Sequence, residues 1–369
     1  MRLLQKECGK CLRHPFLWIV CITFGLFQFL SIYTYVGNAG MRKELRQMHI
    51  AVTDEETASP EYESAYADYK KTYGGMYDTL DMRKILEQKE KMSGYEPQGA
   101  WGMWIVRNYD RLQKRVEQIR KTGEGTYAFY PGSWYKLHST LYGKLWKKLI
   151  LQTAVLMILS MLYLMDYERI YKTQDLVLAT TTGKKMMEKK MLAGTLCGLF
   201  YAGLLTVFTL LVFFAAVPFQ NLWHVPVAAC MVAEPRLQMM YPFVTFWRLE
   251  QWRYLLLALV VLVGLLGIVA AVTAAVQLFL QNSYFSFAVL GLLFMGAYLL
   301  AYVQMGNVWD LIREFFNPTV LYATSGGWFM ENDPCLSFAG NEFAVLFCSG
   351  TAAVCLMAVG KRRYHRLEV

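Results

Sequence analysis

Six long stretches of this 369-residue chain lack any Asp, Glu, Lys, Arg or His. These stretches are residues 16–36, 149–165, 192–217, 254–280, 284–303 and 343–360. Each is close to, or longer than, the ~20 residues with which a helix crosses a hydrocarbon core of about 30 Å. Hydrophobic residues make up 56% of the chain, which favours a membrane protein over a soluble protein of two or three domains. The sequence therefore predicts an all-α integral membrane protein with six transmembrane helices.

The lack of ionisable groups inside these stretches also limits the mechanism. Ion-driven secondary transporters commonly bury carboxylates or other ionisable groups near the bilayer midplane. An intramembrane hydrolase likewise needs polar catalytic groups inside its spans. The six stretches offer only Gln28, Gln152 and Gln277, together with hydroxyl groups. Proton coupling and intramembrane hydrolysis are therefore disfavoured.

Catalytic and cofactor motifs are missing as well. No G-x-x-x-x-G-K-[ST] sequence occurs, so we expect that this chain does not hydrolyse ATP itself. There is neither a nucleophile-elbow sequence nor a His-Glu-x-x-His motif, and the five histidines are scattered along the chain. We expect no catalytic residue, no cofactor site and no metal site here. Any energy that the protein uses must then come from another chain.

The eight cysteines are too dispersed for a disulfide framework. Cys230 and Cys335 fall in loops predicted to lie outside, where a disulfide could form, although two unpaired thiols are the commoner outcome. Cys8 and Cys11 have C-x-x-C spacing, but no second pair completes a zinc site and no adjacent His suits haem attachment. Metal or redox chemistry at this pair is therefore disfavoured.

Lysine and arginine are concentrated in three segments. Residues 1–14, 166–191 and 361–369 carry 14 of them, whereas the loops at 218–253 and 304–342 carry four. Because short cytoplasmic segments carry an excess of basic residues, we predict that both termini and the 166–191 loop are cytoplasmic. The net charge of +9 then reflects topology and attraction to anionic membrane lipids, and nucleic-acid binding is not expected.

These signals divide the chain into five parts. They are a cytoplasmic amphipathic helix at 1–14, transmembrane helix 1 at 15–36, an extracytoplasmic helical domain at 37–148, transmembrane helices 2 to 6 at 149–360 with the cytoplasmic loop 166–191, and a cytoplasmic tail at 361–369. The first hydrophobic stretch could instead be the core of a signal peptide. Its 21 residues exceed the usual length of such a core, so we expect a retained anchor.

The extracytoplasmic segment carries two apolar stripes at helical spacing. The first consists of Tyr62, Tyr66, Tyr69, Tyr73, Met76 and Leu80, and the second of Ile105, Tyr109, Leu112, Val116 and Ile119. A break at 94–99 separates them, which predicts an antiparallel helical hairpin outside the membrane. The tyrosine stripe could bind a ligand, but such stripes are more often the seam between two helices. The aromatic residues at 131–146 and the two outer loops are expected at the outer membrane interface.

Small residues recur at every fourth position in two spans. They are Gly194, Gly198 and Ala202 in the third span, and Gly267, Ala271 and Ala275 in the fourth. This spacing lets helix backbones approach closely, which is a principal source of helix association in lipid. We therefore expect both sets to lie in contacts between helices. Residues 281–283 leave room only for a tight turn between the fourth and fifth spans.

The loop between the second and third spans has the most distinctive sequence. It runs from the acidic span end Asp166-Tyr167-Glu168 to Thr173, then Leu176-Val177-Leu178-Ala179-Thr180, Gly183-Lys184-Lys185, and Lys190-Met191-Leu192-Ala193-Gly194 at the entry to the next span. This pattern resembles that of the permease subunits of ATP-binding-cassette (ABC) exporters of the type-2 family, particularly the single-chain permeases of Gram-positive bacteria. The chain is also similar to that family in its six spans, its amphipathic start and its large first outer segment. That family commonly has a second Glu and a Gly before the Thr, where this chain has Ile170 and Lys172.

The resemblance implies that residues 168–190 include a coupling helix, which docks on a separate cytoplasmic ABC ATPase, and that residues 1–14 form a connecting helix beside it. The coupling-loop residues that it assigns are Glu168, Thr173, Leu176, Leu178, Thr180, Gly183, Lys184 and Lys185. It also implies a bacterial cytoplasmic membrane, a dimer with a second copy or a paralogue, and outward movement of an amphiphilic peptide, lipid or drug. ATP would be used only by the partner subunit.

Two other interpretations fit the same sequence. The basic loop could be a solvated segment that faces lipid headgroups and has no protein partner. The whole chain could also be a non-transporting membrane sensor or mechanical transmitter, which relays binding at its large outer helical domain. The sequence leaves these alternatives open, together with the identity of the substrate and the choice between a homodimer and a heterodimer.

Overall fold

In the computed structural model, the described residues are 2–38, 75–93, 99–126, 137–173, 183–217, 223–232, 242–303, 308–331 and 337–367, with four isolated residues between them. All elements in these ranges are helices, apart from two isolated β-bridges. Six helices are long and apolar enough to cross a membrane, which confirms the predicted number of spans by length and composition. They are α2 (Pro15–Val36), η2 continued by α8 (Ser139–Met165), α11 (Gly183–Ala216), α13 (Gln251–Leu280), α14 (Ser283–Leu300) and α17 (Asn341–Leu367).

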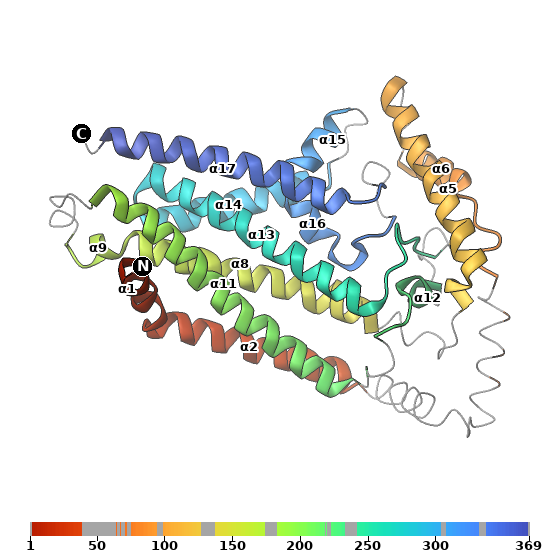
Figure 1. The fold of residues 1–369 in the computed structure, drawn as a ribbon, viewed down its shortest axis with the longest axis horizontal. Helices are drawn as coiled ribbons and strands as arrows, with labels where there is room; N and C mark the ends of the chain where they lie inside the picture. Colours follow the sequence, from red (N-terminus) through yellow and green to blue (C-terminus); the bar gives the residue numbers. More distant parts are fainter. Residues whose placement is uncertain are drawn as a thin grey trace.

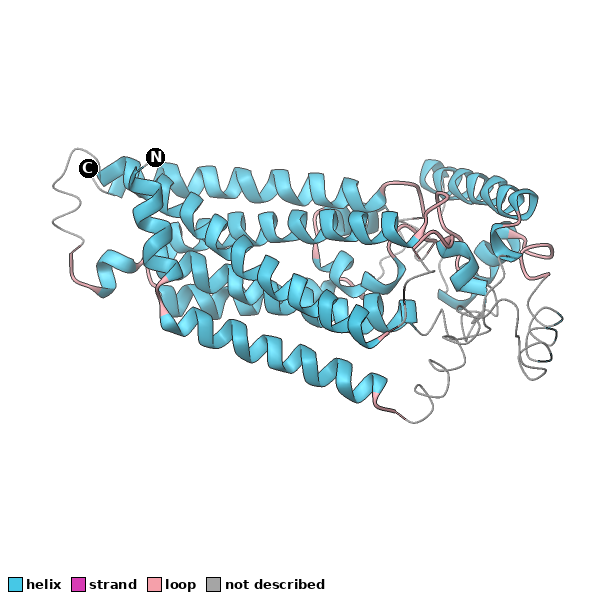
Figure 2. Cartoon of the chain, turned by 60° about the horizontal axis from the view of Figure 1, so that its bottom comes forward, coloured by secondary structure: helices cyan, strands magenta, loops and turns pink. Residues whose placement is uncertain are grey.

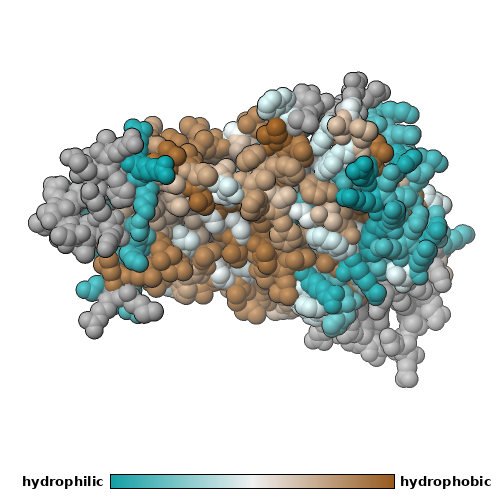
Figure 3. Space-filling model, turned by 45° about the horizontal axis from the view of Figure 1, so that its top comes forward, coloured by the Kyte–Doolittle hydropathy of each residue, from teal (hydrophilic) through white to brown (hydrophobic). Residues whose placement is uncertain are grey.

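The six helices run side by side, and both ends of the chain lie at one end of the bundle (Figures 1 and 2). We call this the terminal end, and it also holds α1 (Arg2–Leu12) and α9 (Tyr167–Ile170). The opposite end carries α5 (Met82–Ser93), α6 (Gly99–Thr122) and α12 (Val227–Val232). Between the two hydrophilic ends, the surface is a belt of hydrophobic side chains (Figure 3). Such a belt suits lipid rather than water.

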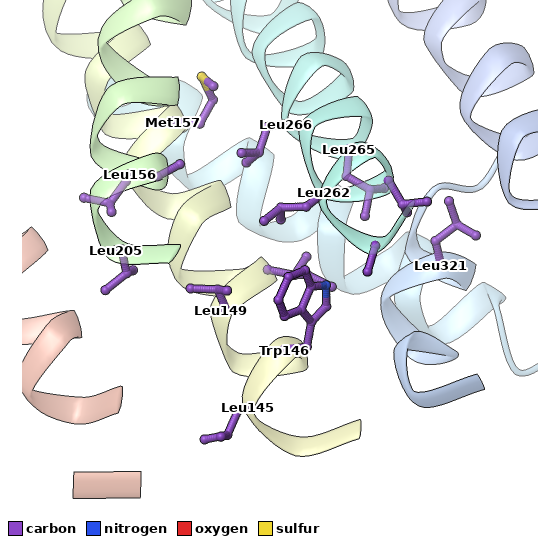
Figure 4. Close-up of a cluster of buried hydrophobic side chains, with 14 of the residues drawn as sticks. Leu145, Trp146, Leu149, Leu156, Met157, Leu205, Leu262, Leu265, Leu266 and Leu321 are labelled. Carbon is purple, nitrogen blue, oxygen red and sulfur yellow. The ribbon is translucent and has the colours of Figure 1, made fainter. Parts of the chain in front are cut away.

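Helix α8 (Trp146–Met165) lies at the centre of the bundle. Of the most apolar 18 residues of each span, 61% are buried in η2–α8, but only 11% are buried in α14. Trp146 and Leu149 of α8 lie beside Leu262 of α13, and Leu205 of α11 approaches from another side (Figure 4). The central helix therefore has protein neighbours around it, whereas α14 presents most of its surface to the surrounding lipid.

Two of the three glutamines inside the spans bind each other. Nε2 of Gln28 in α2 donates a 2.8 Å hydrogen bond to Oε1 of Gln152 in α8, and both side chains are buried. A polar side chain in a hydrocarbon environment is stable only when it has such a partner. This pair therefore fixes the position of α2 along α8.

Helix α11 approaches α8 closely at two glycines. A Cβ atom on Gly194 would lie 3.1 Å from the Cα of Met161, and one on Gly198 would lie 3.1 Å from the Cα of Met157. These distances are shorter than an ordinary contact between carbon atoms. Ala202, one turn further along, is buried. The small residues of α11 thus allow the two backbones to meet, as this spacing does in other membrane helices.

The repeat of small residues in α13 is used differently. A Cβ on Gly267 would meet nothing within 4 Å, Ala271 is half-buried, and Ala275 is buried. The close contacts between α13 and α17 occur at Gly264, where a Cβ would meet a leucine of α17, and at Gly360, where it would lie 3.4 Å from the carbonyl oxygen of Ala275. Spacing alone does not identify which side of a uniformly apolar helix faces a neighbour.

The helix of the second span begins at Ser139, whereas the sequence predicted a span from residue 149. Its first part, η2 (Ser139–Leu145), is a π-helix that continues directly into α8. Tyr142 and Trp146 are buried, and the ring centroids of Tyr142 and Tyr254 are 4.6 Å apart. These aromatic side chains belong to the bundle core instead of lying at the outer interface, because they pack between η2 and α13.

A second hydrophobic core lies at the opposite end of the bundle and is built from segments far apart in the sequence. Its buried members are Tyr77, Met82, Ile85, Leu86, Trp101, Ile105, Tyr109, Leu112, Val116, Ile119, Ala228, Val244 and Phe246. The second predicted stripe is therefore a buried face of α6. The helix that packs against α6 is α5, while Met76 and Leu80 of the first stripe lie outside any helix. The four tyrosines of that stripe lie outside the described residues.

A buried arginine ties α6 to the loop between the third and fourth spans. Arg115 pairs with both carboxylate oxygens of Glu124 in η1 (Glu124–Thr126). Its Nε also donates a 3.1 Å hydrogen bond to the carbonyl oxygen of Thr245. The fixed fork of the guanidinium group thus holds two segments at once.

Glu331 ties the same helices to the loop between the fifth and sixth spans, which also contains α15 (Val308–Phe315), α16 (Thr319–Ala323) and η4 (Ser325–Gly327). It pairs with Lys89 of α5 and accepts a 2.9 Å hydrogen bond from the hydroxyl of Tyr109 in α6. Both outer loops, which were expected at the membrane interface, therefore contribute to one compact domain with α5 and α6.

Replacing Gly198 with alanine is expected to destabilise the protein by about 1–3 kcal/mol, because the added Cβ overpacks the contact with the Met157 backbone. Gly203 is a matched control on the same helix, since a Cβ there would meet nothing within 4 Å. Alanine at 203 should leave stability unchanged or raise it. Thermal unfolding of the purified protein in detergent measures both variants. Equal destabilisation by both would contradict this assignment of the α8–α11 contact.

Candidate functional site

The 166–191 loop begins at a tight corner of the terminal end. Helix α8 stops at Asp166, whose carboxylate accepts a 2.8 Å hydrogen bond from the hydroxyl of Ser283, the first residue of α14. Before Ser283, Gln281 has a left-handed φ of 50°, and the side chain of Asn282 accepts from the first two free amides of α14. The predicted tight turn between the fourth and fifth spans is confirmed. The hydrogen bond from Ser283 to Asp166 also anchors this turn to the start of the 166–191 loop.

Two acidic and two basic side chains form a charge network beside α9, which we define as Glu7, Lys10, Glu168 and Lys190. Glu168 pairs with Lys10 of α1 at 3.2 Å and with Lys190 of α11. Lys10 also pairs with Glu7 at 2.6 Å and lies 4.4 Å from the ring centroid of Tyr167. Glu7, Glu168 and Lys190 are only 1%, 6% and 4% exposed. Their burial is tolerable because the four charges cancel within hydrogen-bonding distance.

The sequence of α1 explains how its charged groups reach this position. Glu7 and Lys10 are three residues apart, so they lie on one side of the helix. The apolar side packs against α11, where the Tyr201 hydroxyl donates to the carbonyl oxygen of Cys11 at 3.4 Å. The amphipathic helix predicted at the N-terminus thus lies across α8 and α11, with Cys11 fully buried.

The C-x-x-C pair of α1 lies against a third cysteine, Cys197 of α11. The Cys197 thiol donates a 3.8 Å hydrogen bond to the carbonyl oxygen of Cys8, and all three thiols are free. Burial raises the pKa of Cys8 to about 11, so this thiol is protonated near neutral pH and is a poor nucleophile. Within the described ranges, no group of three or more His, Cys, Asp or Glu could hold a metal ion. Cys335 and the side chain of Cys230 lie outside them.

The first turn of the loop has an unusual backbone. The Thr173 amide donates to the carbonyl oxygen of Glu168 at 2.8 Å, which closes the turn. Lys172, just before it, has a φ of 54°, a left-handed conformation that glycine adopts most easily. The turn thus has a geometry suited to glycine although a lysine occupies it.

The described loop residues include only part of the predicted coupling set. Glu168 and Thr173 lie together in the first turn, and Glu168 points inward to the charge network. Leu176, Leu178 and Thr180 lie outside the described residues, as do the side chains of Lys184 and Lys185. The backbone of Gly183, Lys184 and Lys185 opens α11. Sequence reasoning missed Glu7 and assigned no site role to Lys10 or Lys190. The available signal was the pairing of Glu7 and Lys10 at i, i+3 in a helix that is otherwise basic.

Replacing Glu168 with glutamine should destabilise the protein by about 3–5 kcal/mol, because it leaves the buried Lys190 and the half-buried Lys10 without their shared carboxylate. Glu188 is a matched control, since its pair with Lys361 is exposed. Glutamine there should cost no more than about 1 kcal/mol. Unfolding of the two purified variants measures how much stability each one has lost. Equal small losses would show that the network does not hold α1 in place.

Replacing Lys172 with glycine should preserve stability or raise it by up to about 1.6 kcal/mol. Glycine removes the cost of the left-handed backbone at this position, which stabilises the folded state by about 1–2 kcal/mol. It also gives the unfolded chain more conformational freedom, which destabilises the folded state by about 0.4–1 kcal/mol. Valine, which is β-branched, should be less stable than lysine here. Thermal unfolding ranks the three proteins. A valine variant as stable as the glycine variant would contradict the left-handed turn.

No protein-family model matches the chain, and no curated protein or solved structure is similar to it. The function of the site therefore has to follow from its own contacts. These contacts join an amphipathic N-terminal helix to both ends of a basic loop, at one end of a multi-pass bundle of membrane-spanning helices.

Proposed function

We propose that this chain is the membrane-spanning permease subunit of an ABC-type exporter, in which a separate cytoplasmic ATPase docks on the 166–191 loop. The observation that carries this proposal is the charge network, because Glu168 ties α1 to the beginning and the end of the loop. A force applied to the loop is passed to α1, α8 and α11 together, since breaking such a buried pair costs about 3–5 kcal/mol. A coupling element needs this mechanical continuity.

An exposed apolar pair beside the network supports a docking role. Ile170 and Tyr171 are 55% and 54% exposed, and they lie at the hydrophilic terminal end instead of in the lipid belt. Exposed apolar groups in such a position are typical of a protein contact. A groove on the ATPase would receive this pair.

The remaining parts of the proposal concern topology and transport. The terminal end would face the cytoplasm of a bacterial cell, because the short segments there carry 14 Lys or Arg, whereas the loops 218–253 and 304–342 carry four. A second copy or a paralogue would cover part of the exposed belt. An amphiphilic substrate would then move outward between the two permeases, along the first, second and fifth spans.

One observation favours a second candidate function, that of a non-transporting sensor or mechanical transmitter. Glu331 links α5 and α6 to the segment just before α17. Binding of a ligand at the outer domain could therefore pull directly on the last span. In this alternative, the loop at the terminal end would report the state of the outer domain to a cytoplasmic partner.

Affinity purification of the membrane complex tests the first proposal. The intact chain should retain an ATPase, and Leu176→Glu or Leu178→Glu should lower coupled ATP hydrolysis about tenfold or more, equivalent to at least about 1.4 kcal/mol of docking free energy. Membrane insertion should be unaffected. Lys121→Glu, an exposed position on α6 at the opposite end, is the control and should couple normally.

If both leucine variants couple ATP hydrolysis as well as the unaltered protein does, the loop is not the docking site of the ATPase. A chain that never retains an ATPase would favour the sensor instead. If an ATPase is retained, accumulation of substrate in sealed vesicles separates transport from signal relay.

A further inference from the structure

Three lysines lie inside the second membrane-spanning helix, and two of them face α2. Nζ of Lys144 lies 5.0 Å from the ring centroid of Tyr35, and Nζ of Lys148 donates a 3.1 Å hydrogen bond to Oγ of Ser31. Lys148 also lies 5.3 Å from the ring centroid of Phe27. With the Gln28–Gln152 bond, these contacts form one line along α2, and Lys144 of η2 and Lys148 and Gln152 of α8 contribute one polar residue at each turn.

The third lysine has a different orientation. Nζ of Lys147 lies 5.2 Å from the ring centroid of Tyr322 in α16, away from α2. Lys147 is half-buried, whereas Lys144 and Lys148 are exposed. The three neighbouring lysines therefore include a pair on one seam and a single residue on another side of the same helix.

The depth of the pair is unusual for exposed ammonium groups. Ser31 follows Pro15, the start of α2, by 16 residues, which corresponds to about 24 Å along the helix. A hydrocarbon core is about 30 Å thick, so Lys148 lies within its outer part or at its edge. A charged group at this depth requires water or a partner of opposite charge.

The pair has no such partner in the parts of the chain that the structure describes. Neither Lys144 nor Lys148 forms an ion pair with Asp or Glu there, and their contacts are with aromatic rings and a hydroxyl group. Two like charges at i, i+4 on one helix face also repel each other. An anion between them would remove both the repulsion and the unpaired charge.

We propose that Lys144 and Lys148 bind the anionic headgroup of a phospholipid, in the leaflet nearer to the opposite end of the bundle. The phosphate would lie between the two ammonium groups, and the Ser31 hydroxyl, which accepts from Lys148, has a proton left to donate. Exposed apolar side chains continue the seam toward the bilayer centre, including Phe27 and Leu151, and these would contact the acyl chains. This site does not depend on ATPase docking.

The test uses the full chain purified in detergent and titrated with phosphatidylglycerol or phosphatidylcholine, with the thermal unfolding midpoint as the readout. Phosphatidylglycerol should raise the midpoint saturably, and phosphatidylcholine should do so much less. The Lys144→Gln/Lys148→Gln variant should bind phosphatidylglycerol about 25-fold more weakly, which corresponds to about 1 kcal/mol for each lysine. The single Lys148→Gln variant, which makes the smaller change, should bind phosphatidylglycerol about fivefold more weakly than the unaltered protein.

Lys147→Gln is the matched control, because it removes the same charge from the same helix on a different side. It should bind phosphatidylglycerol like the unaltered protein, and so should the Lys144→Arg/Lys148→Arg variant. An equal loss in the Lys147 variant would overturn the proposal, since the effect would be one of general basic charge. Unchanged affinity in the Lys148 variant, equal stabilisation by the two lipids, or the same protection by inorganic phosphate alone would also overturn it.

Discussion

The close contact between α8 and α11 is the constraint on which the terminal end depends. Gly194 and Gly198 let the two backbones meet, and these helices are the ones that flank the 166–191 loop. Their separation fixes how far Glu168, just beyond the end of α8, lies from Lys190 near the start of α11. With larger residues at the glycines, this ion pair would be stretched, and α1 would lose the platform on which it lies. Packing in the apolar belt thus determines the geometry of a polar site outside it.

Both ends of the molecule bury charge under the same condition, which is local cancellation. The charge network has two groups of each sign, and the domain at the opposite end of the bundle buries Arg115 with Glu124 and Lys89 with Glu331. Such pairs add little net stability compared with apolar residues of the same size, but removing one partner is costly. They therefore act mainly to select one arrangement of the segments that they join. The lysines on the α2–α8 seam stand apart, because in the described ranges no carboxylate pairs with them.

The sequence predicted the features that depend on composition and local spacing. Six spans, the amphipathic α1 and the turn at 281–283 follow from hydropathy and short-range geometry, and the structure has them. It could not predict which residues of a uniformly apolar helix face a neighbour, so Gly267 was chosen in α13 where Gly264 makes the contact. It also could not foresee that Tyr142 and Trp146 enter the core, because amphipathic aromatic residues suit an interface equally well.

The candidate site was only partly predictable for a related reason. A basic loop between two spans is visible in the sequence, but the partners of Glu168 come from α11 at the far end of the loop and from α1 at the N-terminus. Charge patterns indicate where basic residues gather and do not indicate which carboxylate neutralises which ammonium group. Lys190 precedes an apolar run and was therefore interpreted as a signal of topology, although it is buried in an ion pair. Long-range pairing of this kind follows from the fold.

The domain at the opposite end of the bundle is built from segments far apart in the sequence, which has a consequence for how the protein is made. Lys89 and Glu331 are 242 residues apart, and a ribosome adds about 5–20 residues per second, so the lysine emerges roughly 10–50 s before its carboxylate. During that interval four further spans must enter the bilayer, while the paired helices α5 and α6 wait with an unfinished apolar surface. The domain at the opposite end of the bundle is therefore completed only after four further spans have been made, and its assembly depends on the order in which the spans are inserted.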